Sequence, residues 1–248
     1  MKQTRESKAD YDLWHQGRHE DRPLDEMVLY PWHRNGLSLL KDVAQLKNQQ
    51  VLEVGCGAGD FSIYLAKHGA NVTAIDFSEE AIRIAQLKSA TQAVQVDFVV
   101  KDAQDLSSFP TGTYDVIFSF ECLEHLPDPQ RMVKECYRVL KTNGKIILTT
   151  ENYSNAMVLA WVVTWLKKKP FDSGSGVQPI ENFFVFWVVK RMFRKAGFKE
   201  IKTGGTHHVF LLLPRLDPRT FVKNEFRNGW LRYVFKPFAR HMTFYGVK

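Results

Sequence analysis

The chain of 248 residues contains only three cysteines, Cys56, Cys122 and Cys136. They lack the short spacings typical of metal sites, and an odd number provides no disulfide framework. The first 12 residues are polar and charged, so no apolar signal segment opens the sequence. A largely apolar run at 156–166 falls well short of the ~20 residues that cross a bilayer. These absences lead us to expect a reduced, cytoplasmic protein.

Internal repeats and low-complexity stretches are also absent, and the length is enough for one large α/β domain with insertions. The formal net charge of +7 conceals an uneven distribution. Residues 1–150 carry 17 lysines and arginines against 21 aspartates and glutamates, whereas residues 151–248 carry 17 against 6. A basic second half favours an anionic partner, such as a phosphate-bearing substrate, nucleic acid or lipid headgroups; the alternative is a solvated basic surface.

The stretch Val51–Phe61, V-L-E-V-G-C-G-A-G-D-F, combines a short apolar run with three alternating glycines. The run predicts a buried parallel strand, and the pattern after the glycines predicts a helix. Gly55, Gly57 and Gly59 would let a ligand approach bare backbone at the helix N-terminus. Asp60 stands where the spacing of a dinucleotide site continues, so the pattern is G-x-G-x-G rather than G-x-G-x-x-G. The alternative is a glycine-rich turn with no ligand.

This loop resembles that of class I S-adenosylmethionine (SAM) dependent methyltransferases, and residues 48–152 resemble the core of that family in order and spacing. The resemblance implies a Rossmann-like α/β fold with a doubly wound, mostly parallel, seven-stranded sheet. Ligands of such sheets bind at the carboxyl ends of the strands. We expect a single domain over 1–248: an N-terminal cap at 1–47, a SAM-binding core at 48–152, and a helical, basic and aromatic lid with the last strands at 153–248.

The individual elements follow from apolar periodicity. Helices are predicted at 32–46, 61–68, 79–87, 128–140 and 181–196. Strands are predicted at 51–54, 71–75, 94–100, 114–120, 145–150, 199–202 and 242–247, the last one antiparallel. Turns are predicted at 141–144 and at 204–206, the second leading to His207 and His208.

Asp76 ends the second predicted strand, where a carboxylate can accept hydrogen bonds from both ribose hydroxyls of an adenosine cofactor. It could instead cap the next helix, although Ser78 is also placed for that role. Asp102, after the third strand, is the candidate for binding adenine; the alternative is an ordinary solvated carboxylate. The residues that the resemblance implies for cofactor binding are Glu53, Gly55, Cys56, Gly57, Gly59, Asp76, Phe77, Asp102, Ala103, Phe120 and Glu121.

After the fourth predicted strand the sequence reads E-C-L-E-H-L-P-D-P. It is similar to ubiquinone-biosynthesis O-methyltransferases, in which an E-x-x-E-H set is linked to a divalent metal. In a helix, Glu121, Glu124 and His125 would share a face, and such a set suits Mn²⁺, Fe²⁺ or Zn²⁺ better than Mg²⁺. Glu124 and His125 are also candidates for the base that removes a hydroxyl proton. The alternative is that Glu121 borders the cofactor pocket and His125 packs under the next helix.

Methyl transfer from SAM mainly requires alignment of the acceptor and exclusion of water, so it needs no catalytic nucleophile pattern. The [DN]-P-P-[YFW] motif common in enzymes that methylate base amines is absent, because Ser119–Cys122 occupies its place. This counts against nucleic acid as a partner. We expect SAM-dependent O-methylation of a small or lipid-linked acceptor with an apolar portion or a negative charge. The alternatives are a nucleic-acid methyltransferase and a methyltransferase-like protein that binds SAM without transfer.

The apolar run at 156–166 contains Trp161 and Trp165, which are four residues apart and would share a helix face, and Lys167–Lys169 follow at once. Together with the aromatic and basic segment 183–195, this pattern predicts a lid over the acceptor pocket. Tryptophans beside lysines are also typical of contact with an anionic membrane surface, here the inner face. The alternative is a core helix that packs on the sheet and ends at the lysines.

Overall fold

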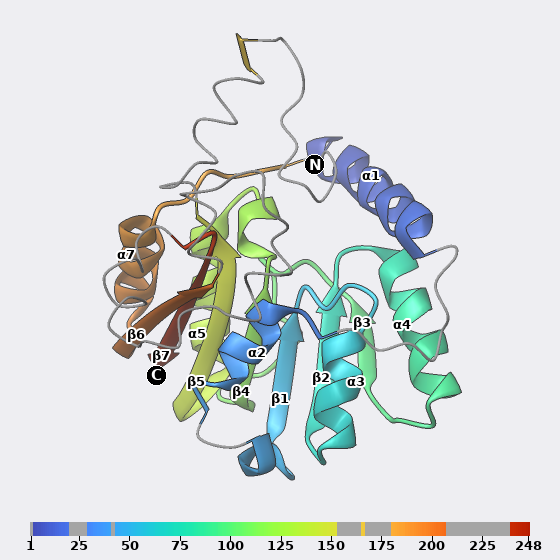
Figure 1. Cartoon of the computed structure of the whole chain (residues 1–248), viewed down its shortest axis with the longest axis horizontal. Helices are drawn as coiled ribbons and strands as arrows, with labels where there is room; N and C mark the ends of the chain where they lie inside the picture. The colour runs from blue at the N-terminus through green and yellow to red at the C-terminus, as the bar shows by residue number, and fades with distance from the viewer. Residues whose placement is uncertain (1, 20–28, 41–42, 153–164, 167–179, 207–238) are drawn as a thin grey trace.

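The computed structural model describes residues 2–19, 29–40, 43–152, 165–166, 180–206 and 239–248. Its centre is a sheet in the order β3-β2-β1-β4-β5-β7-β6, in which β7 runs antiparallel to β5 and β6 (Figure 1). The strands are β1 (Gln50–Val54), β2 (Asn71–Asp76), β3 (Asp97–Val100), β4 (Tyr114–Phe120), β5 (Leu140–Glu151), β6 (Lys199–Thr206) and β7 (His241–Val247). The predicted seven-stranded, mostly parallel α/β fold is therefore confirmed.

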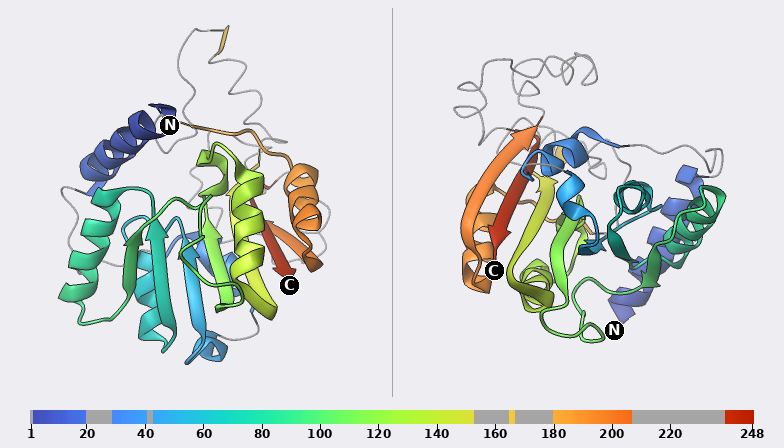
Figure 2. Two further views of the ribbon diagram at one scale, coloured as in Figure 1. Left: turned by 180° about the vertical axis from the view of Figure 1, so that it is seen from behind. Right: turned by 90° about the horizontal axis from the view of Figure 1, so that it is seen from below.

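Helices cover both faces of this sheet (Figure 2). They are α1 (Lys2–His19), α2 (Pro31–Leu37), α3 (Asp60–Lys67), α4 (Glu79–Thr91), α5 (Pro129–Val139) and α7 (Phe186–Ala196), with 3-10 turns η1 (Val43–Leu46) and η2 (Leu123–His125). One buried cluster joins the sheet to α2, α3 and α4, and a second joins it to α5 and α7. No described helix is both long and apolar enough to cross a membrane.

Local sequence sets where the helices around the sheet begin and end. The Ser78 hydroxyl accepts a hydrogen bond from Ala81 N at the start of α4, and the Asp128 carboxylate accepts one from Arg131 N at the start of α5. Gly197 ends α7 with a φ of 108°, a backbone conformation that favours glycine. The predicted role of Ser78 is confirmed.

Several predicted elements have different bounds in the structure, and four of them differ most. The helix expected at 32–46 is only α2, which ends at Leu37, followed by η1; a Cβ on Gly36 would lie 2.7 Å from the Phe120 ring, so this part of α2 packs closely on β4. The helix expected from 181 begins at Phe186, since Asn182 N bonds instead to Glu124 O. The turn expected at 204–206 is strand β6, and the one at 141–144 is a bulge in β5.

Much of the predicted lid lies outside the described residues, including Trp161, Lys167–Lys169, His207 and His208. Trp165 and Leu166 are described, and about two thirds of each side chain is exposed, 66% and 67%. On α7, the buried Val189 and Phe193 face the core while Trp187 remains 64% exposed. The prediction of a lid over the acceptor remains a prediction.

Candidate functional site

A cavity of about 300 Å³ opens at the carboxyl ends of β1, β2 and β4. All the residues predicted for cofactor binding line it except Gly59, and so do Glu124 and His125. The loop after β1 forms one wall, and the segment after β4 forms another. The cavity therefore lies where a doubly wound sheet binds its ligands.

The glycine loop holds its shape through backbone hydrogen bonds to β2. The N–H groups of Gly55 and Cys56 donate to Ile75 O, at 2.8 and 3.0 Å, and Gly57 N donates to Asp76 Oδ2 at 2.8 Å. Gly57 has a φ of 52°, and a Cβ on it would face the cavity side, with His15 as its nearest neighbour at 3.6 Å. A ligand can therefore approach the backbone at Gly57.

Gly59 has a different role from the other two glycines of the loop. It precedes α3 with a φ of 78°, and a Cβ there would lie 2.8 Å from Ala85 and 2.9 Å from Phe98. It allows α3 and α4 to pack closely, and it does not line the cavity.

The Asp76 carboxylate is held at both oxygens. Oδ2 accepts from Gly57 N, and Oδ1 accepts from Ser78 N at 3.0 Å. Because Ser78 caps α4, Asp76 is not needed as the cap and lies in the cavity wall. This geometry leaves the carboxylate available to hydroxyl groups of a ligand.

Asp102 lies across the cavity on the loop after β3. Its Oδ1 accepts from Gln104 N at 2.8 Å and from Gln104 Nε2 at 3.0 Å. Gln104 Oε1 in turn accepts from Asp128 N at 2.7 Å, which ties this loop to the start of α5. Gln104 also lines the cavity, and the sequence analysis did not identify it.

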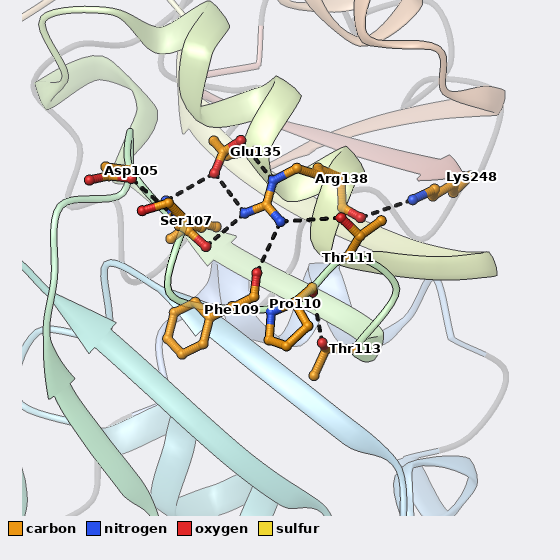
Figure 3. Close-up of polar contacts among 10 residues, drawn as sticks. Asp105, Ser107, Phe109, Pro110, Thr111, Thr113, Glu135, Arg138 and Lys248 are labelled. Carbon is orange, nitrogen blue, oxygen red and sulfur yellow. Dashed lines mark hydrogen bonds and ion pairs between the residues drawn. The ribbon is translucent and has the colours of Figure 1, made fainter.

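The rest of that loop is fixed by α5 (Figure 3). Arg138 donates to Leu106 O at 2.7 Å and to Phe109 O at 2.9 Å, and Glu135 accepts from Leu106 N at 3.1 Å. Both backbone groups of Leu106 are thus paired with one ion pair on α5. The guanidinium beside Glu135 also lowers the pKa of that carboxyl. The loop that carries Asp102 is held at both ends.

The segment after β4 does not form the expected helical face. Glu121 has a left-handed φ of 51°, and only Leu123–His125 forms a 3-10 turn. Thr149 Oγ1 donates to Glu121 Oε1 at 2.7 Å, and His241 Nδ1 lies 2.9 Å from Glu121 Oε2. Glu121 is therefore directed toward β5 and β7.

Glu124 and His125 have other partners. Thr150 Oγ1 donates to Glu124 Oε2 at 2.7 Å, and His125 Nδ1 lies 2.9 Å from Ile180 O. Tyr11 approaches the His125 ring edge-on, with 6.2 Å between centroids. Among the described residues, the structure gathers potential metal ligands at Glu121, Glu151 and His241 rather than at the predicted set.

Burial shifts the pKa values of several groups that line the cavity. It raises the pKa of Glu53 to about 8, with the Ser62 hydroxyl donating to that carboxyl. Burial also raises the pKa of Glu121 to about 7 and that of Glu124, next to it, to about 8. The pKa of the buried His33 falls to about 3, so this imidazole is neutral at physiological pH. The wall thus combines protonatable carboxyl groups with a neutral imidazole.

Several residues lining the cavity were missed by the sequence analysis. The additional aromatic and ionisable side chains are Tyr11, Trp14, His15, Tyr30, Trp32, His33, Asp60, Phe61, Lys101, Cys122, Glu151 and His241. The N-terminal aromatics were expected only as part of a cap. The predicted strand at 145–150 and the predicted antiparallel strand at 242–247 could have indicated Glu151 and His241. The end of β5 and the start of antiparallel β7 meet at the same edge of the sheet as the end of β4.

Known proteins resemble this chain in sequence and in fold. Residues 52–148 match a family model described as a methyltransferase domain. A ubiquinone biosynthesis O-methyltransferase of Xanthomonas oryzae pv. oryzae (strain PXO99A) is 42% identical over 118 residues, 48% of this chain and 49% of that protein. In that comparison the chain spans about half the length of its relative. The protein of the same name from Xanthomonas euvesicatoria pv. vesicatoria (strain 85-10) is 40% identical over 200 residues, 78% of each protein.

Solved structures share the fold. Phosphoethanolamine N-methyltransferase 2 of Haemonchus contortus, in complex with S-adenosyl-L-methionine, has a TM-score of 0.59 and 20% identity, with 87% of this chain and 52% of that chain covered. At this identity the likeness concerns the fold alone. The sequence match over most of the length is decisive: the chain belongs to the SAM-dependent methyltransferase family that these ubiquinone biosynthesis O-methyltransferases represent.

Proposed function

We propose that this protein transfers the methyl group of SAM to a hydroxyl oxygen of a small or lipid-linked acceptor. One observation carries the proposal: the Gly57–Asp76 pair and the Glu121–His241 pair line one cavity. The first pair offers backbone and carboxylate to an adenosine cofactor. The second pair places a carboxylate and an imidazole where an acceptor hydroxyl needs a proton acceptor. Cofactor and acceptor would then react without water between them.

The relatives support oxygen as the receiving atom, because two that are 42% and 40% identical are named ubiquinone biosynthesis O-methyltransferases. The same names support the proposed acceptor class, and so does the cavity wall, where aromatic side chains predominate over aliphatic ones. Trp32 lies at 4.8 Å from the His241 ring and stacks on Tyr30 at 4.6 Å. Such a wall would suit an acceptor with an apolar portion.

In the domain organisation that we propose, residues 1–47 cover the cofactor and residues from 153 cover the acceptor. Tyr11, Trp14 and His15 of α1 line the cavity, which supports the first part. For the second part, Ile180 lines the cavity next to His125. Membrane contact by the basic second half is the third part of the proposal, and it would bring a lipid-linked acceptor to the site.

The proposal is tested by incubating the protein with methyl-labelled SAM and lipid extracts of a strain that lacks it. We expect label in a lipid-soluble product whose mass rises by one methyl group. Parallel incubations with the strain's RNA test the nucleic-acid alternative, which the charge of the second half favours. Label in RNA alone would refute an O-methyltransferase of small acceptors. SAM binding with no label in any fraction would favour a non-catalytic protein.

A further inference from the structure

Three potential metal ligands from three separate strands converge in the cavity. Glu121 follows β4, Glu151 ends β5 and His241 begins β7. Their carboxylate and imidazole ligand atoms all lie within 4.8 Å of one another, and all three residues line the cavity. Glu151 and His241 are buried, at 6% and 5% exposure, so the cluster is shielded from bulk water.

The E-x-x-E-H resemblance implies a divalent ion, but the set it implies does not fit this structure. Glu124 Oε2 accepts from the Thr150 hydroxyl and His125 Nδ1 lies beside Ile180 O, and neither contact by itself prevents metal binding. Neither residue belongs to the group of converging ligand atoms among the described residues. Only Glu121 is common to both sets.

One pair in the observed set has the separation of adjacent ligands. Two ligands at right angles, each about 2.1 Å from an ion, lie about 3 Å apart. His241 Nδ1 and Glu121 Oε2 lie 2.9 Å apart, and Thr149 Oγ1 holds the other oxygen of that carboxylate at 2.7 Å. A carboxylate oriented by a hydroxyl is a typical support for a metal ligand.

The charge at the cluster also fits a divalent ion. Arg240 Nη2 lies 3.4 Å from Glu151 Oε1 and offsets one of the two carboxylates. With Glu121 and Glu151 ionised and the Arg240 guanidinium counted, the local charge is about −1 before a divalent ion binds and about +1 afterwards. A deprotonated acceptor oxygen would then restore neutrality, so the ion and the acceptor would favour each other's binding.

We infer that Glu121, Glu151 and His241 form a divalent-metal site at the acceptor end of the cavity, in place of the Glu121, Glu124 and His125 set. Two carboxylates and an imidazole suit Mn²⁺, Fe²⁺ or Zn²⁺ better than Mg²⁺. A bound ion would polarise the acceptor's hydroxyl group as a Lewis acid. Glu121 and His241 would then hold the ion instead of accepting the hydroxyl proton, which would pass to Glu124, a residue that lines the same cavity. The inference rests on the proposed function for this use of the ion, but the binding itself does not depend on it.

The test measures binding directly, by titrating the full-length protein with Mn²⁺ and following the electron paramagnetic resonance signal of free Mn²⁺. We expect one Mn²⁺ per chain, with at least tenfold weaker binding in His241→Asn and in Glu151→Gln. Glu124→Gln and His125→Asn should bind Mn²⁺ within about twofold of the unmodified protein. His241→Asn is the cleaner variant, because Glu151→Gln also removes the ion partner of Arg240.

Two results would overturn the inference. Unmodified protein that binds neither Mn²⁺ nor Zn²⁺ has no such site. Loss of binding in Glu124→Gln and His125→Asn, with normal binding in His241→Asn, assigns the ion to the other set. SAM affinity, measured by calorimetry on every variant, confirms that each one is folded. Because Mn²⁺ binding is read without turnover, failure of methyl transfer would refute the proposed function and leave the metal result standing.

Discussion

The backbone N–H of Gly57 donates a hydrogen bond to Asp76 Oδ2 at 2.8 Å, and this bond joins the glycine loop to the end of β2. The bond also presents Asp76 to the cavity with a fixed orientation. The structure thus links the two sequence features on which the cofactor prediction depends. Substitution of Asp76 should therefore disturb both the ligand contacts and the loop.

We predict that Asp76→Asn lowers SAM affinity by about 10-fold to 100-fold. The amide keeps the shape, but it loses the charge, and charge-assisted hydrogen bonds contribute about 1.5–3 kcal/mol. Calorimetric titration with SAM measures the change. Asp97→Asn, at the exposed start of β3, is the matched control and should bind normally. Equal affinity in Asp76→Asn and Asp97→Asn would show that Asp76 does not contact the cofactor.

Alanine at Gly57 should mainly weaken SAM binding, whereas alanine at Gly59 should mainly lower the free energy of unfolding. Gly57→Ala should cost only about 1 kcal/mol in the free energy of unfolding, from its left-handed φ, but should strongly weaken SAM binding. Gly59→Ala adds a clash with Ala85 and Phe98 to a similar strain, so it should cost about 2–5 kcal/mol. Urea denaturation and calorimetry separate the two effects. A Gly57→Ala variant with normal SAM affinity would contradict the placement of the cofactor.

Glu53 should make the protein less stable as pH rises. Burial raises the pKa of Glu53 from 4.5 to about 8 in the folded state, so the folded chain holds a proton that the unfolded chain releases. The free energy of unfolding should therefore fall between about pH 5 and 8, by at most about 1.4 kcal/mol per pH unit from this residue. Glu53→Gln should flatten that slope in urea denaturation. An unchanged slope would assign the pH dependence to other carboxyl groups such as Glu124.

The core of the fold was predictable from sequence because its signals are local. Alternation of short apolar strands with capped helices located every strand and α-helix from β1 to β5, though not the 3-10 turn η2, and Asp128 and Ser78 mark helix starts. The errors arose where tertiary contacts override local pattern. β7, for example, pairs with residues 204–206 and makes them part of strand β6.

The site was predictable on the cofactor side and less so on the acceptor side. The glycine loop, Asp76 and Asp102 follow three successive predicted parallel strands, so their meeting at one edge of the sheet could be predicted. Glu151 and His241 are 90 residues apart in the sequence, and only the antiparallel insertion of β7 beside β5 brings them together. For Glu121, the left-handed backbone turns the side chain away from the helical register that the sequence suggested.

Helix α1 should control release of the cofactor. It lies above the carboxyl edge of the sheet beside α4 (Figure 1), and its Asp12 accepts hydrogen bonds from Ser78 Oγ and from Glu80 N. We predict that Asp12→Ala speeds SAM dissociation about fivefold, since one such contact contributes about 1 kcal/mol. Stopped-flow measurement of tryptophan fluorescence reports the rate of SAM dissociation, because Trp14 and Trp32 line the cavity. Asp10→Ala, exposed on the same helix, is the control, and equal rates in both variants would refute a covering role for α1.

The basic second half should bind anionic membranes. On α7, Trp187, Arg191 and Arg194 are exposed on one face, opposite the buried Val189 and Phe193. Lys167–Lys169 lie outside the described residues, but each basic residue near an anionic surface contributes about 1 kcal/mol, so the three together give about 3 kcal/mol.

Unmodified protein should float with anionic vesicles at low salt and remain in solution with neutral ones. A Lys167/Lys168/Lys169 triple alanine variant should not float, whereas a Lys47/Lys67/Arg83 variant that loses the same charge elsewhere should. If unmodified protein stays in solution with both kinds of vesicle, the exposed face of α7 has another partner, and a lipid-linked acceptor would have to reach the cavity from solution.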